Sequence, residues 1–183
     1  MNTLGKLRTI ADGELELMRS WRNAPAVRSN MYTRQEISSE EHLTWWARTK
    51  ACKDQQYFMY ESGGVALGIV GFMLIDHASA NCSWAFYAAP DAPRGTGSQM
   101  EYLALEHAFN NLKLHKLHCE VLAFNTGVIK LHQKFGFHVE GIFRQHHRVD
   151  GDYVDIYRLG LLAPEWSDKR EEMQAKLTPR QKD

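Results

Sequence analysis

The sequence has few cysteines and no long apolar run. Its three cysteines, Cys52, Cys82 and Cys119, are odd in number and lie in segments that we predict to be a helix and two strands. This pattern argues against a disulfide framework and favours a reducing compartment. No stretch approaches the roughly 20 apolar residues of a membrane span, and residues 1–9 lack the apolar run of a signal peptide. We therefore expect a soluble, cytoplasmic protein.

The chain also lacks an excess of charge of either sign. Lys plus Arg and Asp plus Glu both total 22, so no net field draws the protein to nucleic acid or to an anionic membrane. With 183 residues and 44% hydrophobic content, the chain can bury one core and is too short for two comfortable domains. We place the domain at residues 1–165, followed by a charged C-terminal helix and tail at residues 166–183.

Nine histidines raise the question of a metal site. His115 and His118 beside Cys119 have the spacing of a ligand half-site, but no second half-site accompanies them. A structural zinc ion needs about four convergent ligands. His146 and His147 are neighbours on a predicted strand, so their side chains face opposite sides. We therefore expect no metal.

Two helices are predicted near the start of the chain. Asp12 precedes an apolar stripe at helical spacing and is typical of an N-cap, and Pro25 marks the end of this helix. Ser38 and Glu41 have the spacing of a capping box, which predicts that a second helix begins there.

Runs of β-branched and aromatic residues predict strands over the rest of the chain. We expect strands at 57–60, 67–75, 84–87, 117–124, 139–149 and 153–162, with helices starting near 97 and 125 and a short helix after 164. Gly136 should adopt a left-handed conformation after a helix, and Asp150 with Gly151 should form a type I′ turn. This order predicts an α/β (α+β) domain with a mixed sheet covered by helices.

The strongest local signal is a glycine-rich turn between a predicted strand and a predicted helix, Ala88-Ala-Pro-Asp-Ala-Pro-Arg-Gly-Thr-Gly-Ser98. Gly95 and Gly97 let the backbone approach a bulky anion, and the free N–H groups at the helix start would favour a diphosphate. The spacing matches neither the P-loop nor the Rossmann pattern. An ordinary tight turn is the alternative.

A second segment, Asn125-Thr-Gly-Val-Ile-Lys-Leu-His-Gln-Lys-Phe-Gly-Phe137, follows the first at a characteristic distance. Together they resemble the two cofactor-binding motifs of the GNAT acetyltransferases. The resemblance implies a mostly antiparallel sheet of about seven strands flanked by helices, with splayed central strands, and acetyl-coenzyme A as co-substrate. It assigns these residues to the coenzyme: Tyr87, Ala88, Ala89, Arg94, Gly95, Thr96, Gly97, Ser98, Asn125 and Lys134.

The sequence departs from that family pattern at two positions. Ala92 stands where members often have Gln or Arg, three residues before the first glycine of the turn. His132 stands where many members have a tyrosine that protonates the departing thiolate. An imidazole can still donate an N–H, and its proton affinity lies nearer the operating pH than that of a phenol. We predict His132 as the general acid, and a solvent-facing helix residue is the alternative.

Within the family, the chain most resembles the N-acetyltransferases of pseudaminic-acid biosynthesis, which modify the sugar used to decorate flagellin. The matching segments include Trp21-Arg-Asn, Arg28-Ser-Asn-Met-Tyr32, His42-Leu-Thr-Trp45 and Trp84-Ala-Phe-Tyr87. This resemblance implies a UDP-linked 4-amino-4,6-dideoxy sugar as the acceptor and is compatible with a homodimer. The implied substrate-binding residues are Met31, Tyr32, Trp45, Tyr87 and Glu120.

Glu120 would accept the proton of the sugar amine, directly or through water, as the amine attacks the thioester. It stands in an otherwise apolar strand, where an unpaired buried carboxylate is costly. The alternative is a salt bridge to Lys116, Arg144 or another cation, and for Trp45 the alternative is a plain core position. Cys119 should face the side of the strand opposite Glu120, which disfavours a nucleophilic cysteine.

Two other functions stay open at this point. The acceptor could be a protein N-terminus, as in the ribosomal-protein acetyltransferases. The chain could also be a non-catalytic acyl-coenzyme A-binding module, for which His132 in place of tyrosine is the only hint in the sequence.

Overall fold

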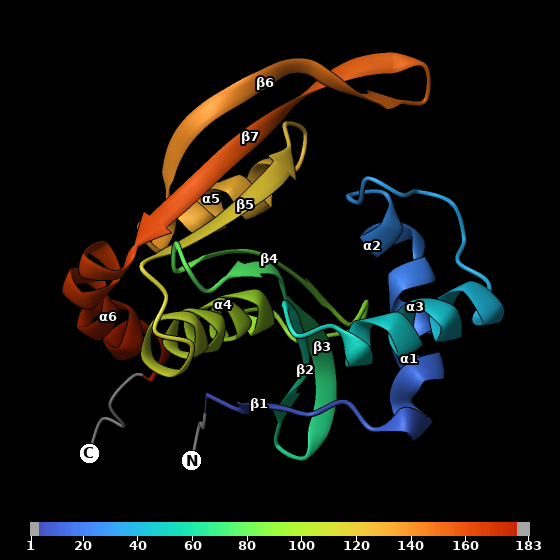
Figure 1. Cartoon of the computed structure of the whole chain (residues 1–183), viewed down its shortest axis with the longest axis horizontal. Helices are drawn as coiled ribbons and strands as arrows, with labels where there is room; N and C mark the ends of the chain where they lie inside the picture. Colours follow the sequence, from blue (N-terminus) through green and yellow to red (C-terminus); the bar gives the residue numbers. More distant parts are fainter. Residues whose placement is uncertain (1–3, 179–183) are drawn as a thin grey trace.

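The structure, a computed structural model that describes residues 4–178, is a seven-stranded sheet flanked by helices (Figure 1). The strand order is β1-β2-β3-β4-β5-β7-β6, and every neighbouring pair is antiparallel except β4 with β5. The predicted mixed, mostly antiparallel sheet is confirmed. The strands are β1 (Lys6–Arg8), β2 (Gln55–Ser62), β3 (Val65–Asp76), β4 (Asn81–Ala88), β5 (Lys116–Leu122), β6 (His138–Val149) and β7 (Asp152–Leu162).

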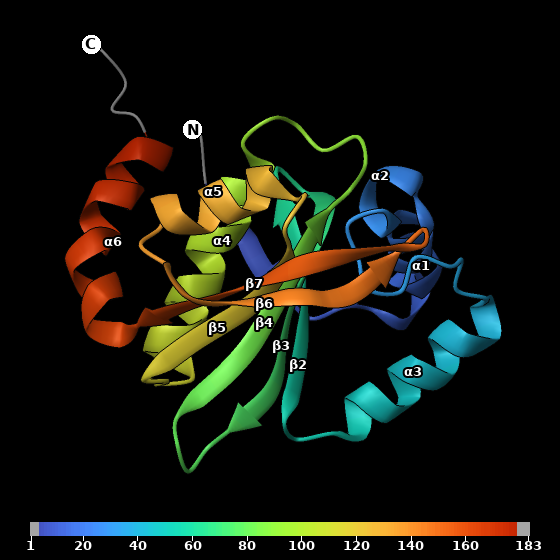
Figure 2. The same ribbon diagram turned by 90° about the horizontal axis from the view of Figure 1, so that it is seen from above.

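Helices lie on both sides of this sheet. Seen from above, α1, α2 and α3 lie on one side and α4 and α6 on the other (Figure 2). Across residues 4–178, none of the helices has the length and apolar character needed to cross a membrane. The helices are α1 (Leu15–Asn23), α2 (Pro25–Arg28), α3 (Ser39–Ala51), α4 (Thr96–Glu106), α5 (Thr126–Lys134) and α6 (Ala163–Leu177), with a 3₁₀ turn η1 (Asp12–Glu14) and a π-helical segment η2 (His107–Asn111).

Local signals at the element ends are largely confirmed. The hydroxyl of Ser38 accepts the N–H of Glu41, and the Glu41 carboxylate accepts the N–H of Ser38, so the capping box is present. Asp150 and Gly151 both have positive φ, as a type I′ turn requires. The prediction for Asp12 was wrong, because η1 precedes α1 and the Asp12 carboxylate instead accepts a hydrogen bond from a lysine of α3.

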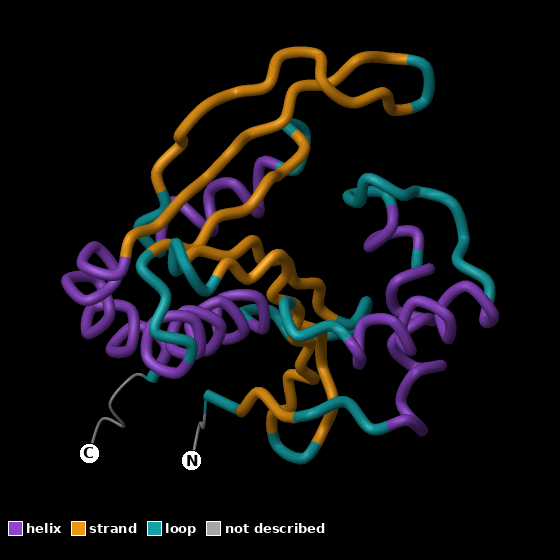
Figure 3. The backbone as a smooth tube through the Cα atoms, in the orientation of Figure 1, coloured by secondary structure: helices purple, strands orange, loops and turns teal. Residues whose placement is uncertain are grey.

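The strands β2 and β3 divide the core into two clusters. Adjacent residues of a strand face opposite sides of a sheet. Met59 and Ile69 therefore pack on the side of α1 and α3, whereas Tyr60 and Val70 pack on the side of α4 and α6. Trp46 of α3 belongs to the first cluster. The long loop between α2 and α3 borders this side of the molecule (Figure 3).

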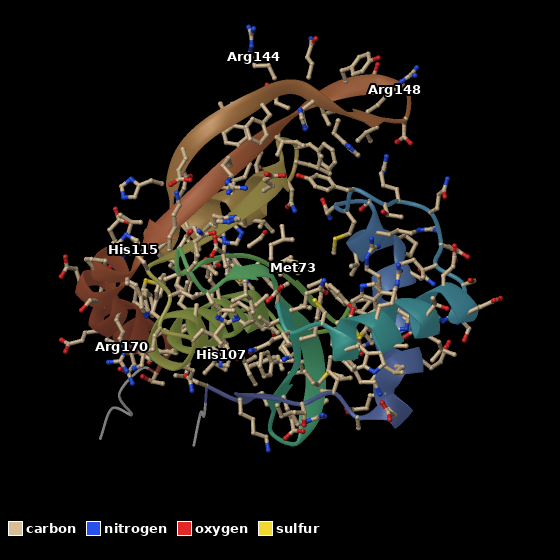
Figure 4. The ribbon with its side chains drawn as sticks, in the orientation of Figure 1. Met73, His107, His115, Arg144, Arg148 and Arg170 are labelled. Carbon is tan, nitrogen blue, oxygen red and sulfur yellow. The ribbon has the colours of Figure 1, made fainter. Side chains whose placement is uncertain are left out.

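The last helix is an integral part of the larger cluster. Trp166 of α6 is buried, and its ring lies edge-on to Tyr102 with centroids 5.5 Å apart. The indole N–H donates to Glu106 over 3.0 Å. Arg170, labelled in Figure 4, binds the same carboxylate from α6. Helix α6 is thus joined to the domain by an aromatic anchor and by a shared acidic partner.

We expect Trp166→Ala to lower the free energy of unfolding by about 3–5 kcal/mol, because it removes a large buried ring and leaves a cavity. Urea denaturation followed by circular dichroism measures this change. Gln174→Ala on the exposed face of the same helix is the control, with an expected change of about 0.5 kcal/mol or less. Equal effects of the two substitutions would mean that α6 does not depend on this anchor.

Candidate active site

The strands β4 and β5 separate in the middle of the sheet. These parallel strands are paired at three positions, and the last pair is Ser83 with His118. Beyond that pair the strands diverge (Figure 1) and border a cavity of about 500 Å³, which we call the splay cleft. The splaying predicted for the central strands is therefore confirmed. Residues that line the splay cleft include Phe86, Tyr87, Ala88, Ala89, Gly97, Cys119, Glu120, Asn125, Leu131 and His132.

Backbone groups of β4 alternate between the β3 side and the splay cleft. Ala89 donates its N–H to the carbonyl of Leu67 over 2.8 Å, and Ala88 is paired with Gly68. In an antiparallel pair this register directs both backbone groups of Tyr87 towards β3. The N–H and C=O of Ala88 consequently face the cleft. Of the neighbouring residues Tyr87 and Ala88, it is therefore Ala88 that offers a free backbone N–H to the splay cleft.

The glycine-rich turn places the start of α4 beside the splay cleft. Gly95 is the N-cap residue of α4, and its φ of 96° lies in the left-handed region that favours glycine. The N–H and hydroxyl of Thr96 both bond to the carbonyl of Pro93. The N–H groups of Gly97 and Ser98 are then the first donors without a helical partner, at the positive end of the helix dipole.

His132 of α5 and Glu101 of α4 form a buried pair in the wall of the splay cleft. The Nδ1 atom of His132 lies 2.8 Å from Oε1 of Glu101, and the side chains are 4% and 0% exposed. Burial raises the pKa of Glu101. Burial is the largest single influence on His132 and lowers its pKa, but Glu101 and Cys119 together outweigh burial and raise that pKa to about 10. The alternative of a solvent-facing His132 is wrong.

Glu120 of β5 is held by two partners. Arg158 donates to Oε1 over 3.0 Å, and the hydroxyl of Tyr32 donates to Oε2 over 2.9 Å. The salt bridge that we gave as an alternative is therefore present, with Arg158 as the cation. Lys116 is paired with another carboxylate, and Arg144 lies on the outer side of the β6–β7 hairpin, away from the cleft (Figure 4).

A second cavity, which we call the side pocket, adjoins the splay cleft. It has a volume of about 420 Å³, lies between α1, α3 and the sheet, and shares Met31 and Tyr87 with the cleft. Trp45 and Tyr57 form an edge-to-face pair in its wall, with centroids 5.1 Å apart. Of the two neighbouring tryptophans, Trp45 thus lines a pocket and Trp46 belongs to the core. Its wall is predominantly aromatic and apolar.

One cation in the side pocket, Arg22, is half-buried and has one fully buried nitrogen. Arg22 donates from Nη2 to the carbonyl of Thr33 over 2.9 Å, whereas its Nη1 is buried without a hydrogen-bond partner among the described residues. Burial lowers the pKa of Arg22, yet a guanidinium stays charged in proteins. A buried donor left unpaired is costly. This atom is therefore suited to an oxygen of a ligand that enters the pocket.

Cysteines and histidines do not form a metal centre in the described part of the chain. All three cysteines are free thiols, and Cys119 borders the splay cleft. His115 is exposed, whereas His118 is buried, which lowers its pKa to about 4. Within residues 4–178, no three His, Cys, Asp or Glu side chains gather in an arrangement that could hold a metal ion.

The structure brings most of the predicted site residues together and adds others. Arg94 to Ser98 form the turn beside the splay cleft, whereas Lys134 ends α5 outside the cleft wall. Residues that the sequence analysis missed are Arg22, Tyr57, Glu101 and Arg158. Only Glu101 had a local signal, since a carboxylate on the apolar stripe of a helix needs a partner.

An open mixed sheet that splays at a parallel strand pair, beside a glycine-rich helix start, defines a class of acyl-group transferases. The family model described as "Acetyltransferase (GNAT) domain" matches residues 6–138 of the chain. The chain belongs to the GNAT acetyltransferase family. It is accordingly an N-acetyltransferase that uses acetyl-coenzyme A.

Curated relatives are acetyltransferases, and one of those described below has its acceptor, spermidine, in its name. Acetyltransferase PseH of Campylobacter jejuni is 30% identical over 124 residues, which span 68% of this chain and 76% of the relative. Spermidine N(1)-acetyltransferase of Escherichia coli K12 is 26% identical over 58% of each chain, so the match spans less than two thirds of that relative. The probable N-acetyltransferase YjcK of Bacillus subtilis is 30% identical over 62% of this chain and 65% of its own.

Solved structures share the fold at low sequence identity. Spermidine N-acetyltransferase from Vibrio cholerae, solved in complex with CoA and spermine, superposes with a TM-score of 0.84. The superposition covers 88% of this chain and 97% of the other, at 21% identity. At this identity the likeness establishes the fold and leaves the acceptor open.

We expect Gly71→Ala to destabilise the wall of the side pocket. A Cβ atom at Gly71 would lie 2.4 Å from Cε1 of Tyr57, so the ring would have to move, which should lower the free energy of unfolding by about 1–3 kcal/mol. Tyr57→Leu in the same chain should restore part of the loss, as a double-mutant cycle measures. Gly13→Ala, where a Cβ meets no atom within 4 Å, is the control. Additive effects of the two substitutions would refute the contact.

Proposed function

We propose that this acetyltransferase transfers the acetyl group of acetyl-coenzyme A to the 4-amino group of a UDP-linked 4-amino-4,6-dideoxy sugar. This is a reaction of pseudaminic-acid biosynthesis, which supplies the sugar for flagellin glycosylation. Its main support is the character of the side pocket, whose largely apolar and aromatic wall includes one guanidinium with a buried N–H that has no partner among the described residues. The relative named PseH supports the same acceptor.

The apolar wall of the side pocket suits a deoxy sugar. A 6-deoxy sugar carries a methyl group, and the acceptor also bears an N-acetyl group, both of which gain from contact with aromatic faces. Met31, Trp45 and Tyr87 would provide this wall, with Tyr57 as a further member. Tyr32 and Glu120 would lie at the junction with the splay cleft, where the amine must meet the donor.

In this proposal, the position of Arg22 in the side pocket favours a nucleotide sugar over a polyamine. Arg22 presents a buried N–H that fits a diphosphate oxygen and would repel a polycation. Two acidic residues also border the pocket, but Glu36 pairs with Arg28 at 3.2 Å and Glu41 is engaged by Ser38 at the start of α3. Both carboxylates therefore already interact with other groups of the protein.

The donor would lie along the splay cleft. Its pyrophosphate would bind the turn from Arg94 to Ser98, where the N–H groups at the start of α4 are available. The pantetheine arm would run between β4 and Asn125. Acetyl-coenzyme A would also contact the side chain of Tyr87, Ala88 and Ala89, and Lys134 at the end of α5.

The chemistry would be a direct attack of the neutral amine on the thioester carbonyl. The free N–H of Ala88 would stabilise the oxyanion, because it faces the cleft. Glu120 would take the amine proton; its carboxylate already accepts two hydrogen bonds and retains further lone pairs. His132 would protonate the departing thiolate. No covalent enzyme intermediate is required, so Cys119 is not a nucleophile in this scheme.

Gly97→Ala tests the placement of the donor. A Cβ atom at Gly97 would lie 3.5 Å from Leu131 and 3.6 Å from Phe86, which is ordinary contact. Stability should therefore hold or rise by up to about 1 kcal/mol, since alanine is the better helix former. Affinity for acetyl-coenzyme A, measured by calorimetry, should fall about tenfold or more because the added methyl group enters the cleft. Unchanged affinity would place the donor elsewhere.

An acceptor panel tests the substrate. Thiol release from acetyl-coenzyme A should occur with the UDP-linked 4-amino sugar and not with spermidine or a peptide amine. Arg22→Met should raise KM for the nucleotide sugar by about 10–100-fold, because a charged hydrogen bond is lost. Arg48→Met is the matched control, since Arg48 is exposed on α3 and lies outside the pocket wall. Turnover of spermidine or a peptide instead would refute the sugar, and donor binding without turnover of any amine would indicate a binding module.

A further inference from the structure

The buried carboxylate of Glu101 contacts His132, the proposed general acid, on the side of the ring away from the splay cleft. Glu101 is 0% exposed, and only one of its oxygens is paired, at 2.8 Å from Nδ1 of His132. The other oxygen, Oε2, is buried and has no hydrogen-bond partner among the described residues. Such a group is expensive to bury, and an apolar residue of similar volume would stabilise the fold at least as well. Its position behind His132 therefore points to a role beyond packing.

We propose that Glu101 is a positioning residue that keeps His132 protonated and aims its Nε2 into the splay cleft, so that the pair acts as one acid towards the departing thiolate. This inference rests on the proposed role of His132 in the transfer reaction. Glu101 itself touches neither substrate, because the imidazole ring lies between it and the cleft.

The geometry fixes the orientation of the imidazole. Nδ1 is held by Glu101, which leaves Nε2 on the side of the ring that faces Cys119 and the splay cleft. Aromatic rings surround the imidazole, with centroid distances of 5.3 Å to Trp84, 6.0 Å to Phe86 and 5.1 Å to Phe137. A ring flip would break the Glu101 contact and place that carboxylate against carbon. The ring is thus locked in one orientation.

The charges around His132 favour its protonated form. Glu101 faces the ring from α4, and Cys119 from β5 also raises its pKa. On α5, Lys134 acts on Glu101 and favours its carboxylate. The side chains of β4 at this wall, Trp84 and Phe86, do not titrate. Together these groups hold the pKa of His132 at about 10, close to the ordinary value of about 10 for a tyrosine phenol.

The proton balance of the step is simple. When the C–S bond of the tetrahedral intermediate breaks, the thiolate takes the proton on Nε2 of His132 and leaves as the thiol. His132 becomes neutral and retains the Nδ1 proton that it donates to Glu101. Water that enters after product release returns the lost proton. The amine proton leaves separately through Glu120, so no oxidant or further reactant is required.

The state of the pair can be read without any substrate. In the free protein labelled with ¹⁵N-histidine, both ring nitrogens of His132 should stay protonated up to about pH 9 in the wild type. In Glu101→Gln, which preserves a hydrogen-bond acceptor but removes the charge, His132 should lose a proton at a clearly lower pH than in the wild type, because burial then disfavours the charged ring and Cys119 is the remaining group that raises its pKa. His132→Phe assigns the signal among the nine histidines. A neutral His132 at pH 7.5 in the wild type would overturn the proposal whatever the acceptor proves to be.

Turnover then tests whether this proton matters. With an amine that the enzyme acetylates, Glu101→Gln should lower kcat about 100-fold at pH 8.5, and the loss should shrink towards pH 5.5. The ratio of variant to wild type cancels the ionisation of the amine itself. In a His132→Tyr background the same substitution should change kcat less than about threefold, since a phenol carries its own proton at these pH values.

Equal losses in the two backgrounds, or a loss that does not depend on pH, would show that Glu101 merely supports the fold and would overturn the proposal. If Glu101→Gln fails to fold, the titration of wild-type His132 still decides the outcome. If no amino sugar is turned over while His132 titrates as expected, the assignment of the sugar is wrong, but the proposed role of Glu101 towards His132 is still supported.

Discussion

The incomplete pairing of β4 with β5 is the constraint on which the site depends. A sheet that continued its ladder here would satisfy every backbone group of both strands and leave no space between them. Because pairing stops at Ser83 and His118, the cleft side of β4 keeps free backbone groups, with Ala88 among them. The two cavities, the start of α4 and the wall formed by α5 are all arranged around this opening.

Two charged side chains each have a buried polar atom near one of the cavities. Arg22 and Glu101 each keep one polar atom buried without a partner among the described residues, and each borders or backs one of the two cavities. Charges of this kind are costly when they serve packing alone. Their location favours the interpretation that each is arranged for a ligand or a proton. Glu120, by contrast, is partly exposed, and each of its oxygens accepts one hydrogen bond, from Tyr32 and from Arg158.

Much of the fold was predictable because its signals are local. The capping box at Ser38 and the type I′ turn at Asp150 and Gly151 involve residues close in the chain, and both are present. The glycine-rich turn likewise marked the start of α4, with Gly95 as its left-handed residue. Asp12 shows the limit of such signals, since a lysine from α3 competes for its carboxylate. Tertiary contacts then override a local preference.

The sequence by itself determined the order of strands and helices, the two cofactor-binding segments and hence the family, because periodicity, turns and motifs are encoded by neighbouring residues. Only the tertiary structure decided which side chains meet: Glu101 with His132 across 31 positions, Tyr32 with Glu120 across 88, and Trp45 with Tyr57 in the side pocket. Such pairs depend on where β4 and β5 part and on how the helices dock. No local sequence pattern carries that information, since the burial of a side chain and its pKa depend on all the residues that pack around it in the folded protein.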